Sequence, residues 1–322
     1  MKHFLHNFCA FCLALHAFAA SANDVHFVVP GGAGSGWDST ARAVGLALRQ
    51  AGLIETASFE NISGAGSGKA IGTLIETAER QTGTLMVNST PIIVRSLTNI
   101  FPYSFRDLTP VARLIGDYQV LVTRPDSPLE DFSDVLARYR QNPRSVKICG
   151  GSVRGDLDHL VPALALKAAG EDARRLAYVP YDGGGKALAG FLTGEGDVLS
   201  TGLSEALEYH RSGKLRIIAV SAEARVPVLP DVSTFVEQGV DFEFINWRGF
   251  FAAPGIPEER ADAFASLLEA MIQTPEWETL RRQYGWQNRY LARAAFTTFL
   301  ERQEQEIRTL MLELGFMREP AP

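Results

Sequence analysis

The five-residue sequence Gly-Ala-Gly-Ser-Gly occurs twice in this chain, and each copy follows a strand-like run and precedes a segment with helical spacing. The copies occupy residues 32–36 and 64–68. Glycine has no Cβ atom, and the first turn of a helix carries N–H groups without partners inside the helix, so a strand–glycine–helix turn suits an anion. Consecutive βαβ units place such turns along one sheet edge. The pair therefore predicts a shared anion-binding crevice; the alternative is that each run only makes a tight turn.

Two more glycine-rich turns, at residues 150–155 and 182–186, follow strand-like runs in the second half of the chain. Their spacing closely matches that of the first pair. We therefore expect an α/β protein of two lobes, each a mixed sheet flanked by helices. Lobe I is expected to comprise residues 23–122 and 247–322, and lobe II residues 123–246.

The connections between the lobes are expected in two apolar, strand-like segments, at residues 119–123 and 242–252. The C-terminal part, from residue 261 to residue 314, alternates apolar residues with charges at helical spacing. This pattern is typical of amphipathic helices, and we expect these helices to cover lobe I.

Residues 1–22 have the features of a secretory signal peptide. Lys2 gives a positive start, an apolar run at residues 8–18 follows, and Ala20-Ser21-Ala22 is a small-residue cleavage pattern. The apolar run is too short to span a bilayer as a membrane anchor. We therefore expect an exported protein that is cleaved after this pattern and begins at Asn23.

Composition argues against several classes of function. Acidic residues outnumber basic residues by 37 to 31, which argues against a nucleic-acid partner. Cys149 is the single cysteine beyond the signal peptide, so no internal disulfide is expected and the thiol is interpreted as a small buried apolar group. The histidines outside the signal peptide lack the spacing of metal ligands, and we expect no metal.

Motifs for catalysis and for cofactors are incomplete. Residues 64–69 resemble a nucleotide P-loop, but the glycine spacing before Lys69 is wrong and Ala70 stands where a Ser or Thr is needed. Neither glycine pair gives G-x-G-x-x-G, and no serine lies in a G-x-S-x-G elbow. His159 and its neighbouring aspartates diverge on a helix and do not form a triad. We therefore expect no cofactor, and a binding protein rather than an enzyme.

Candidate ligand contacts come from the glycine-rich turns and from polar residues that follow strands at the same sheet edge. These candidates are Ser35, Gly36, Trp37, Gly66, Ser67, Ser89, Thr90, Ser152, Arg154, His159, Gly183 and Ser204. Hydroxyls at the carboxyl end of a strand lie where open α/β sheets bind ligands. The alternative for Ser89 or Thr90 is that its side chain caps the next helix.

Other candidates also keep a structural alternative. The Trp37 side chain either forms part of the wall of the ligand site or packs between helices. Arg154 either meets a carboxylate with its two-pronged guanidinium or lies in solvent. His159 is interpreted as a structural or ligand-contacting residue rather than a base. Asp38 is expected to cap the helix that begins near Ser39.

Seven motifs occur in a fixed order along the mature chain. They are Val29-Pro30-Gly31-Gly32 through Asp38-Ser39-Thr40-Ala41-Arg42, Asn61-Ile62-Ser63-Gly64-Ala65-Gly66, Leu108-Thr109-Pro110-Val111-Ala112-Arg113-Leu114, Gly150-Gly151-Ser152 with Asp158-His159, Tyr181-Asp182-Gly183-Gly184-Gly185, Gly213-Lys214-Leu215-Arg216, and Asn246-Trp247-Arg248-Gly249. With these motifs the chain resembles the TctC/Bug family of periplasmic substrate-binding proteins of tripartite tricarboxylate transporters. Gly36-Trp37-Asp38 and Asn246-Trp247-Arg248 resemble the tricarboxylate-binding branch, whereas Ser63 and residues 80–83 depart from the family pattern.

The resemblance implies a Venus-flytrap fold in which a hinge closes on the ligand. It also implies that backbone N–H groups and hydroxyls hold a small tri- or dicarboxylate, such as citrate, between the lobes. The implied partner is the two-component membrane permease of the transporter, the implied location is the periplasm, and we expect a monomer. A ligand sensor for a membrane kinase and an exported hydrolase of the same shape are the alternatives.

Overall fold

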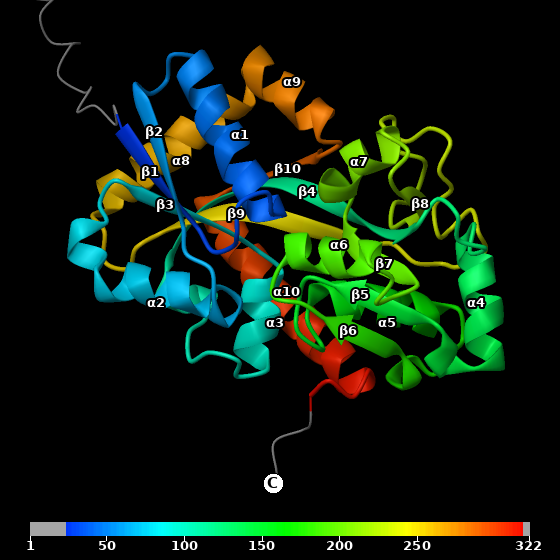
Figure 1. Cartoon of the computed structure of the whole chain (residues 1–322). Helices are drawn as coiled ribbons and strands as arrows, with labels where there is room; N and C mark the ends of the chain where they lie inside the picture. The colour runs from blue at the N-terminus through cyan, green and yellow to red at the C-terminus, as the bar shows by residue number, and fades with distance from the viewer. Residues whose placement is uncertain (1–23, 318–322) are drawn as a thin grey trace, which may run out of the picture.

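The computed structural model describes residues 24–317 (Figure 1). The predicted signal peptide and the predicted start at Asn23 lie outside these described residues. Within them, the chain forms two α/β lobes side by side, each a mixed sheet flanked by helices, as the glycine-turn pattern predicts.

The sheet of lobe I has the strand order β2-β1-β3-β9-β4, and β10 also pairs with β4. Its strands are β1 (Asp24–Val29), β2 (Thr56–Asn61), β3 (Thr84–Ser89), β4 (Thr109–Thr123), β9 (Ile245–Ala252) and β10 (Gln287–Ala292). The first three are parallel, since helices connect them by crossovers, and β9 and β4 are antiparallel to their neighbours.

Helices cover both faces of this sheet because its strand residues are apolar on both sides. Phe27 and Val29 share one core with α1 (Gly36–Gln50), α8 (Glu258–Ile272) and α9 (Pro275–Gln283). Val28 and Met86 point to the opposite face and pack with α2 (Gly68–Glu76), α3 (Pro91–Leu97) and α10 (Arg293–Glu313).

The sheet of lobe II continues from β4 in the order β4-β7-β5-β6, with β8 also paired to β4. Its strands are β5 (Lys147–Gly150), β6 (Ala177–Pro180), β7 (Val198–Gly202) and β8 (Arg216–Val220). Its helices are α4 (Phe132–Gln141), α5 (Leu157–Ala168), α6 (Gly184–Leu192) and α7 (Leu203–Arg211). Five short 3-10 turns complete the described chain: η1 (Ala65–Ser67), η2 (Ala78–Arg80), η3 (Phe105–Asp107), η4 (Pro143–Ser145) and η5 (Ala173–Arg175).

Strand β4 belongs to both lobes and runs through the centre of the molecule (Figure 1). Its residues up to Tyr118 pair with β9, and its residues from Gln119 onward pair with β7 and β8. The segment expected to connect the lobes at residues 119–123 is therefore the second part of a strand that begins at Thr109. The pairing of β4 shows only where this strand passes from the sheet of lobe I to the sheet of lobe II, between Tyr118 and Gln119. The lobe limits given above therefore remain a prediction.

The C-terminal helices pack on lobe I, as expected, and the end of α10 also reaches lobe II. The helix itself contacts α3 and β4. Past its end, the ring of Phe316 packs at 4.7 Å against the ring of His159 in lobe II, and Lys167 of α5 hydrogen-bonds to Glu313. The end of the chain thus ties both lobes together.

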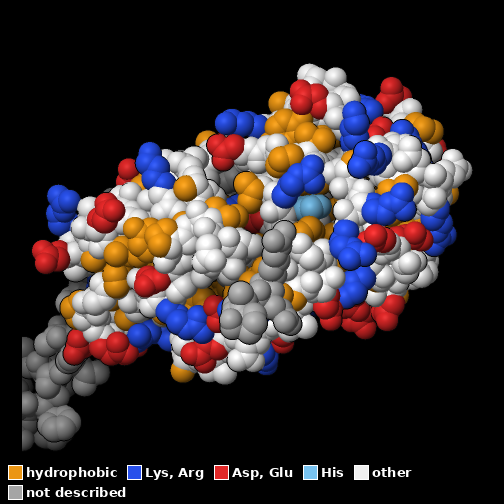
Figure 2. Space-filling model, turned by 90° about the horizontal axis from the view of Figure 1, so that it is seen from below, with side chains coloured by type: hydrophobic (Ala, Val, Ile, Leu, Met, Phe, Trp, Pro, Cys, Tyr) orange, Lys and Arg blue, Asp and Glu red, His pale blue; other side chains and the backbone are white. Residues whose placement is uncertain are grey.

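The surface of the molecule mixes charges of both signs. Basic and acidic side chains alternate over the face seen from below (Figure 2), in keeping with the modest excess of acidic residues. Across residues 24–317, no helix combines the length and the apolar character needed to cross a bilayer.

Gly249 of β9 provides a test of this packing. An added Cβ would lie 2.6 Å from the Phe296 ring and 2.8 Å from the carbonyl oxygen of Ala112 on β4. Because β9 lies between β3 and β4, we expect Gly249→Ala to lower the free energy of unfolding by about 1–3 kcal/mol through overpacking. Thermal denaturation of the variant beside Gly83→Ala, where an added Cβ meets no atom within 4 Å, measures the difference. Equal melting temperatures for the two variants would contradict this packing.

Candidate ligand-binding cleft

A cleft of about 500 Å³ lies between the lobes, and all four glycine-rich turns line it. Lobe I contributes residues of the turns after β1 and β2, and lobe II contributes residues of the turns after β5 and β6. These turns lie where the carboxyl ends of parallel strands meet the first turns of helices. The crevice predicted from the repeated glycine sequence is therefore present.

Side chains hydrogen-bond to the backbone of the first glycine-rich turn, at residues 32–36, and stabilise it. Ser35 is the N-cap of α1 and accepts a hydrogen bond from the Asp38 N–H at 3.3 Å. The Asp38 carboxylate turns back to accept from the Gly34 N–H at 2.9 Å, and from Arg42 and Asn61. Burial raises the pKa of Asp38, but these hydrogen bonds outweigh it and hold the pKa below the ordinary value. The expectation that Asp38 caps the helix is wrong, because the helix begins three residues earlier than expected.

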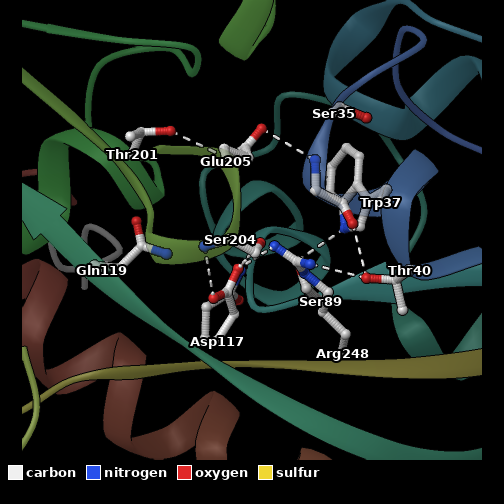
Figure 3. Close-up of polar contacts among 12 residues, drawn as sticks. Ser35, Trp37, Thr40, Ser89, Asp117, Gln119, Thr201, Ser204, Glu205 and Arg248 are labelled. Carbon is white, nitrogen blue, oxygen red and sulfur yellow. Dashed lines mark hydrogen bonds and ion pairs between the residues drawn. The ribbon is translucent and has the colours of Figure 1, made fainter. Parts of the chain in front are cut away.

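A buried arginine packs against the first turn (Figure 3). Arg248 of β9 donates from Nη2 to Asp117 at 2.6 Å and from Nη1 to the Thr40 hydroxyl at 2.8 Å. A Cβ at position 36 would lie 2.2 Å from Nη2, so only Gly36 fits beside this guanidinium. Ser204 of lobe II also donates to Asp117, at 2.6 Å, and extends the network across the lobes.

Glu205 of lobe II reaches into the same turn of lobe I. Its Oε1 accepts from the Gly36 N–H at 3.0 Å, and its Oε2 accepts from the Thr201 hydroxyl at 3.1 Å (Figure 3). The Glu205 carboxylate of the protein itself thus accepts a hydrogen bond from an N–H group in the first turn of α1. This arrangement shows the kind of group that the turn binds, since the acceptor is a carboxylate from the opposite lobe.

The second turn has an unusual backbone. Ala65, Gly66 and Ser67 all have positive φ angles, of 46°, 59° and 83°. No side chain caps α2, because Ser67 occupies the N-cap position in the left-handed region. A Cβ at Gly66 would lie 2.6 Å from Nη1 of Arg95, so this glycine also accommodates a buried guanidinium.

The two turns of lobe II differ in how their helices are capped. Asp156 is the N-cap of α5 and accepts from the Leu157 N–H at 2.8 Å, and Ser152 accepts from the Asp158 N–H at 3.0 Å. Helix α6 has no side-chain cap, because its N-cap is Gly183 with φ at 104°. The first residues of α6 line the cleft and present their N–H groups from lobe II.

Asp158 is an acidic group within the cleft wall. Burial, with the nearby carboxylates of Glu205 and Asp156, raises its pKa to about 8, against the opposing effects of a hydrogen bond from the Gly151 N–H and of Arg95. The carboxyl group of Asp158 is therefore largely neutral at pH 7. The cleft accordingly carries less negative charge than its acidic residues suggest.

Eight of the twelve candidate residues line the cleft, and four do not. Those that line it are Ser35, Gly36, Trp37, Gly66, Ser67, Ser89, Ser152 and Gly183. Trp37 forms part of the wall, and its indole N–H donates to the Ser89 hydroxyl at 2.9 Å. Those outside the lining are Thr90, Arg154, His159 and Ser204.

Each residue outside the lining makes other hydrogen bonds, although the buried hydroxyl of Thr90 has no partner. The Thr90 N–H donates to the side chain of Asn246 at 3.3 Å, Arg154 donates to the Tyr178 carbonyl at 2.7 Å, and Ser204 binds Asp117. His159 accepts from the Gly155 N–H at 2.9 Å and stacks on Tyr178. Burial, with Arg154 nearby, lowers the pKa of His159 to about 4, so this imidazole is a neutral packing group.

Several cleft residues are absent from the candidate ligand contacts predicted from the sequence. They are Arg95, Asp158, Glu205, Asn246 and Arg248. Arg95 interrupts an apolar helix segment, and a lone charge in such a segment was the available signal. Asp158, Asn246 and Arg248 lie inside motifs of the family resemblance. Nothing in the local sequence distinguishes Glu205 from a solvated helix residue.

Solved structures of known proteins share this architecture. The periplasmic binding protein BugD superposes with a TM-score of 0.79 at 23% identity, covering 91% of this chain and 97% of that chain. The R. palustris protein Rpa4515, solved with adipate, gives a TM-score of 0.81 at 22% identity, covering 91% and 97%. MatC from Rhodopseudomonas palustris, solved with malate, gives 0.77 at 22% identity, covering 89% and 98%. These likenesses confirm the two-lobed binding-protein fold.

Sequence comparison establishes the family. Protein BugT of Bordetella pertussis is 30% identical over 241 residues, which is 73% of this chain and 72% of BugT. A protein from Pseudomonas sp. strain P51, encoded in the tcbD-tcbE intergenic region, is 28% identical over 272 residues, 83% of this chain and 79% of that protein. The model of the tripartite tricarboxylate transporter family receptor, TctC, matches residues 40–316. This chain therefore belongs to the TctC family, as its sequence motifs and its two-lobed cleft together indicate.

Proposed function

We propose that this protein captures a small di- or tricarboxylate in the interlobe cleft and delivers it to the membrane permease of a tripartite tricarboxylate transporter. The observation that carries the proposal is the convergence of glycine-rich helix starts from both lobes on one cleft of about 500 Å³. Such turns present N–H donors and a positive helix end, which favour carboxylates. The proposal includes a periplasmic location, where the permease would meet the protein, and the predicted signal peptide supports it.

The size and the donors of the cleft suit an acid of a few carbons. Binding pockets of about 300–1,000 Å³ enclose small organic ligands. A hydrogen bond to a charged group contributes about 1.5–3 kcal/mol, and micromolar binding needs about 8 kcal/mol, so several converging donors suffice after ordering costs. Malate and adipate, found with the neighbours MatC and Rpa4515, are acids of this class.

The composition of the cleft favours binding over hydrolysis. Among the described residues that line it, none is a histidine or a cysteine. His159, the histidine near the third turn, packs against Tyr178 and Phe316. A serine nucleophile in the cleft would therefore lack an adjacent imidazole base.

A panel of acids and one cleft variant test the proposal. We expect succinate, malate, adipate or citrate to raise the melting temperature of the mature protein, and calorimetry to give a 1:1 complex. Gly185→Asp places a carboxylate in the first turn of α6, where an added Cβ meets no atom within 4 Å. The acidic side chain complements the helix dipole, so the unliganded variant should remain as stable while losing the thermal shift through charge repulsion.

The matched control for this variant is Gly83→Asp, which adds the same charge at an open position outside the cleft lining. This control should keep the full thermal shift. An unchanged shift in Gly185→Asp would move the binding site elsewhere. No binding by any of the four acids would overturn the proposed function.

The pH dependence of affinity gives a separate prediction. The pKa of Asp158 lies at about 8, so the carboxyl group is neutral below this pH and anionic above it. An anionic ligand favours the neutral form, hence affinity for malate should fall as the pH rises from 7 to 9, by at most about tenfold per pH unit. Glu205, Asp156 and Arg95 face this carboxyl group and shape its titration.

Calorimetry at several pH values measures the effect. Asp158→Asn keeps an oxygen acceptor for the Gly151 N–H but cannot ionise, so affinity should become nearly independent of pH over this range. The same slope in both proteins would assign the titration to another group.

A further inference from the structure

The cleft contains two buried arginines that differ in their hydrogen bonding. Arg248 is 3% exposed, and its guanidinium is held by Asp117 and by the Thr40 hydroxyl. Arg95 is 5% exposed and also lines the cleft, but its Nη1 has no hydrogen-bond partner. Each guanidinium lies against a glycine of a lobe I turn, Gly36 for the first and Gly66 for the second. Arg248 shows how protein groups can satisfy a buried guanidinium here, and Arg95 departs from that pattern.

Arg95 links the two lobes. It lies on α3 of lobe I, and its Nε donates to the carboxylate of Asp156, the N-cap of α5 in lobe II, at 2.5 Å. The side chain of Asp156 is fully buried. A guanidinium has five donors in a planar fork, so one edge can hold Asp156 while Nη1 remains open to another acceptor.

Ser67, in the turn against which Arg95 packs, provides a second unsatisfied group. Its Oγ is buried and has no hydrogen-bond partner, and the residue is 1% exposed. It follows Gly66, the residue against which Nη1 of Arg95 packs. Ser67 also has a φ of 83°, which is costly for a residue with a side chain and is a feature of ligand-clamping loops.

We propose that Arg95 and Ser67 form a subsite for one carboxylate of the ligand. We further propose that a carboxylate bound there favours closure of the two lobes, because Arg95 also binds Asp156 of lobe II. This inference rests on the proposed function and adds to it a charged anchor beside the backbone donors. A buried cationic donor without a partner is destabilising, so a ligand carboxylate that satisfies Nη1 favours the closed arrangement. The second carboxylate of a dicarboxylate then faces the uncapped start of α6 in lobe II.

A carboxylate bound in this subsite would stabilise the closed arrangement of the lobes. Without ligand, closure buries Arg95 with an unsatisfied Nη1, which opposes the gain from its ion pair with Asp156. With ligand, both edges of the guanidinium are satisfied, so the ligand binds the closed form more tightly than the open form. This differential affinity is what a binding protein needs for the acid to drive closure.

Ser67→Ala is the sharpest test, because it removes a hydroxyl that has no hydrogen-bond partner within the protein. We expect its unliganded melting temperature to equal or exceed that of the wild type, while affinity for the tightest-binding acid of the panel falls about 10-fold. The matched control is Ser212→Ala, an exposed hydroxyl that binds the Tyr209 carbonyl. A residue with a merely structural role would lower stability and leave affinity unchanged.

Arg95→Met extends the test by removing the charge, with Arg106→Met as the control, since Arg106 is exposed and pairs with Glu304. We expect affinity to fall about 100-fold in Arg95→Met and to stay unchanged in the control. The Arg95→Met and Ser67→Ala effects should also be less than additive in the double variant, because both residues bind the same carboxylate.

The outcomes separate this inference from the proposed function. If the wild type binds an acid and both Ser67→Ala and Arg95→Met bind it equally well, the subsite is wrong and the proposed function stands. If the two effects add fully, the residues do not share a carboxylate and the subsite is also overturned. If the wild type binds none of the four acids, both proposals fail.

Discussion

The first turn of a helix carries N–H groups that have no partner within the helix, and this constraint shapes the whole cleft. Four strand–turn–helix units direct such turns at one gap between the lobes. Two of these helices, α1 and α5, are capped by their own side chains, from Ser35 and Asp156. The other two, α2 and α6, lack a side-chain cap. At α2 the Gly68 N–H donates to the Ala65 carbonyl and the Lys69 N–H to the Gly64 carbonyl, whereas the first residues of α6, from Gly184 to Lys186, line the cleft.

Two carboxylates of the protein itself accept hydrogen bonds across the cleft, from one lobe to the other. Glu205 of lobe II accepts from the Gly36 N–H of lobe I, and Asp156 of lobe II accepts from Arg95 of lobe I. These contacts hold the lobes together around the cleft. A bound acid must complement them, and the neutral form of Asp158 lowers the repulsion that an anion would otherwise meet. The cleft thus combines open donors with a limited negative charge.

The glycine turns could be predicted from sequence because their signal is local. Glycine clusters between a strand pattern and a helix pattern mark the turns at the carboxyl ends of strands, and all four turns line the cleft. Side-chain roles were harder to predict, because they depend on partners far away in sequence. His159 packs against Phe316, and Ser204 binds Asp117, contacts that no local pattern encodes. Arg95 was missed for the same reason, since its partner Asp156 belongs to the other lobe.

The most direct measurement is an amide-resolved NMR titration of the mature protein with a small dicarboxylate. We expect backbone N–H signals to shift in turns of both lobes, at Gly66 in lobe I and at Gly184 and Gly185 in lobe II, with the same saturation curve. Shifts confined to one lobe, or located away from the cleft, would contradict the claim that helix starts from both lobes converge on one bound acid.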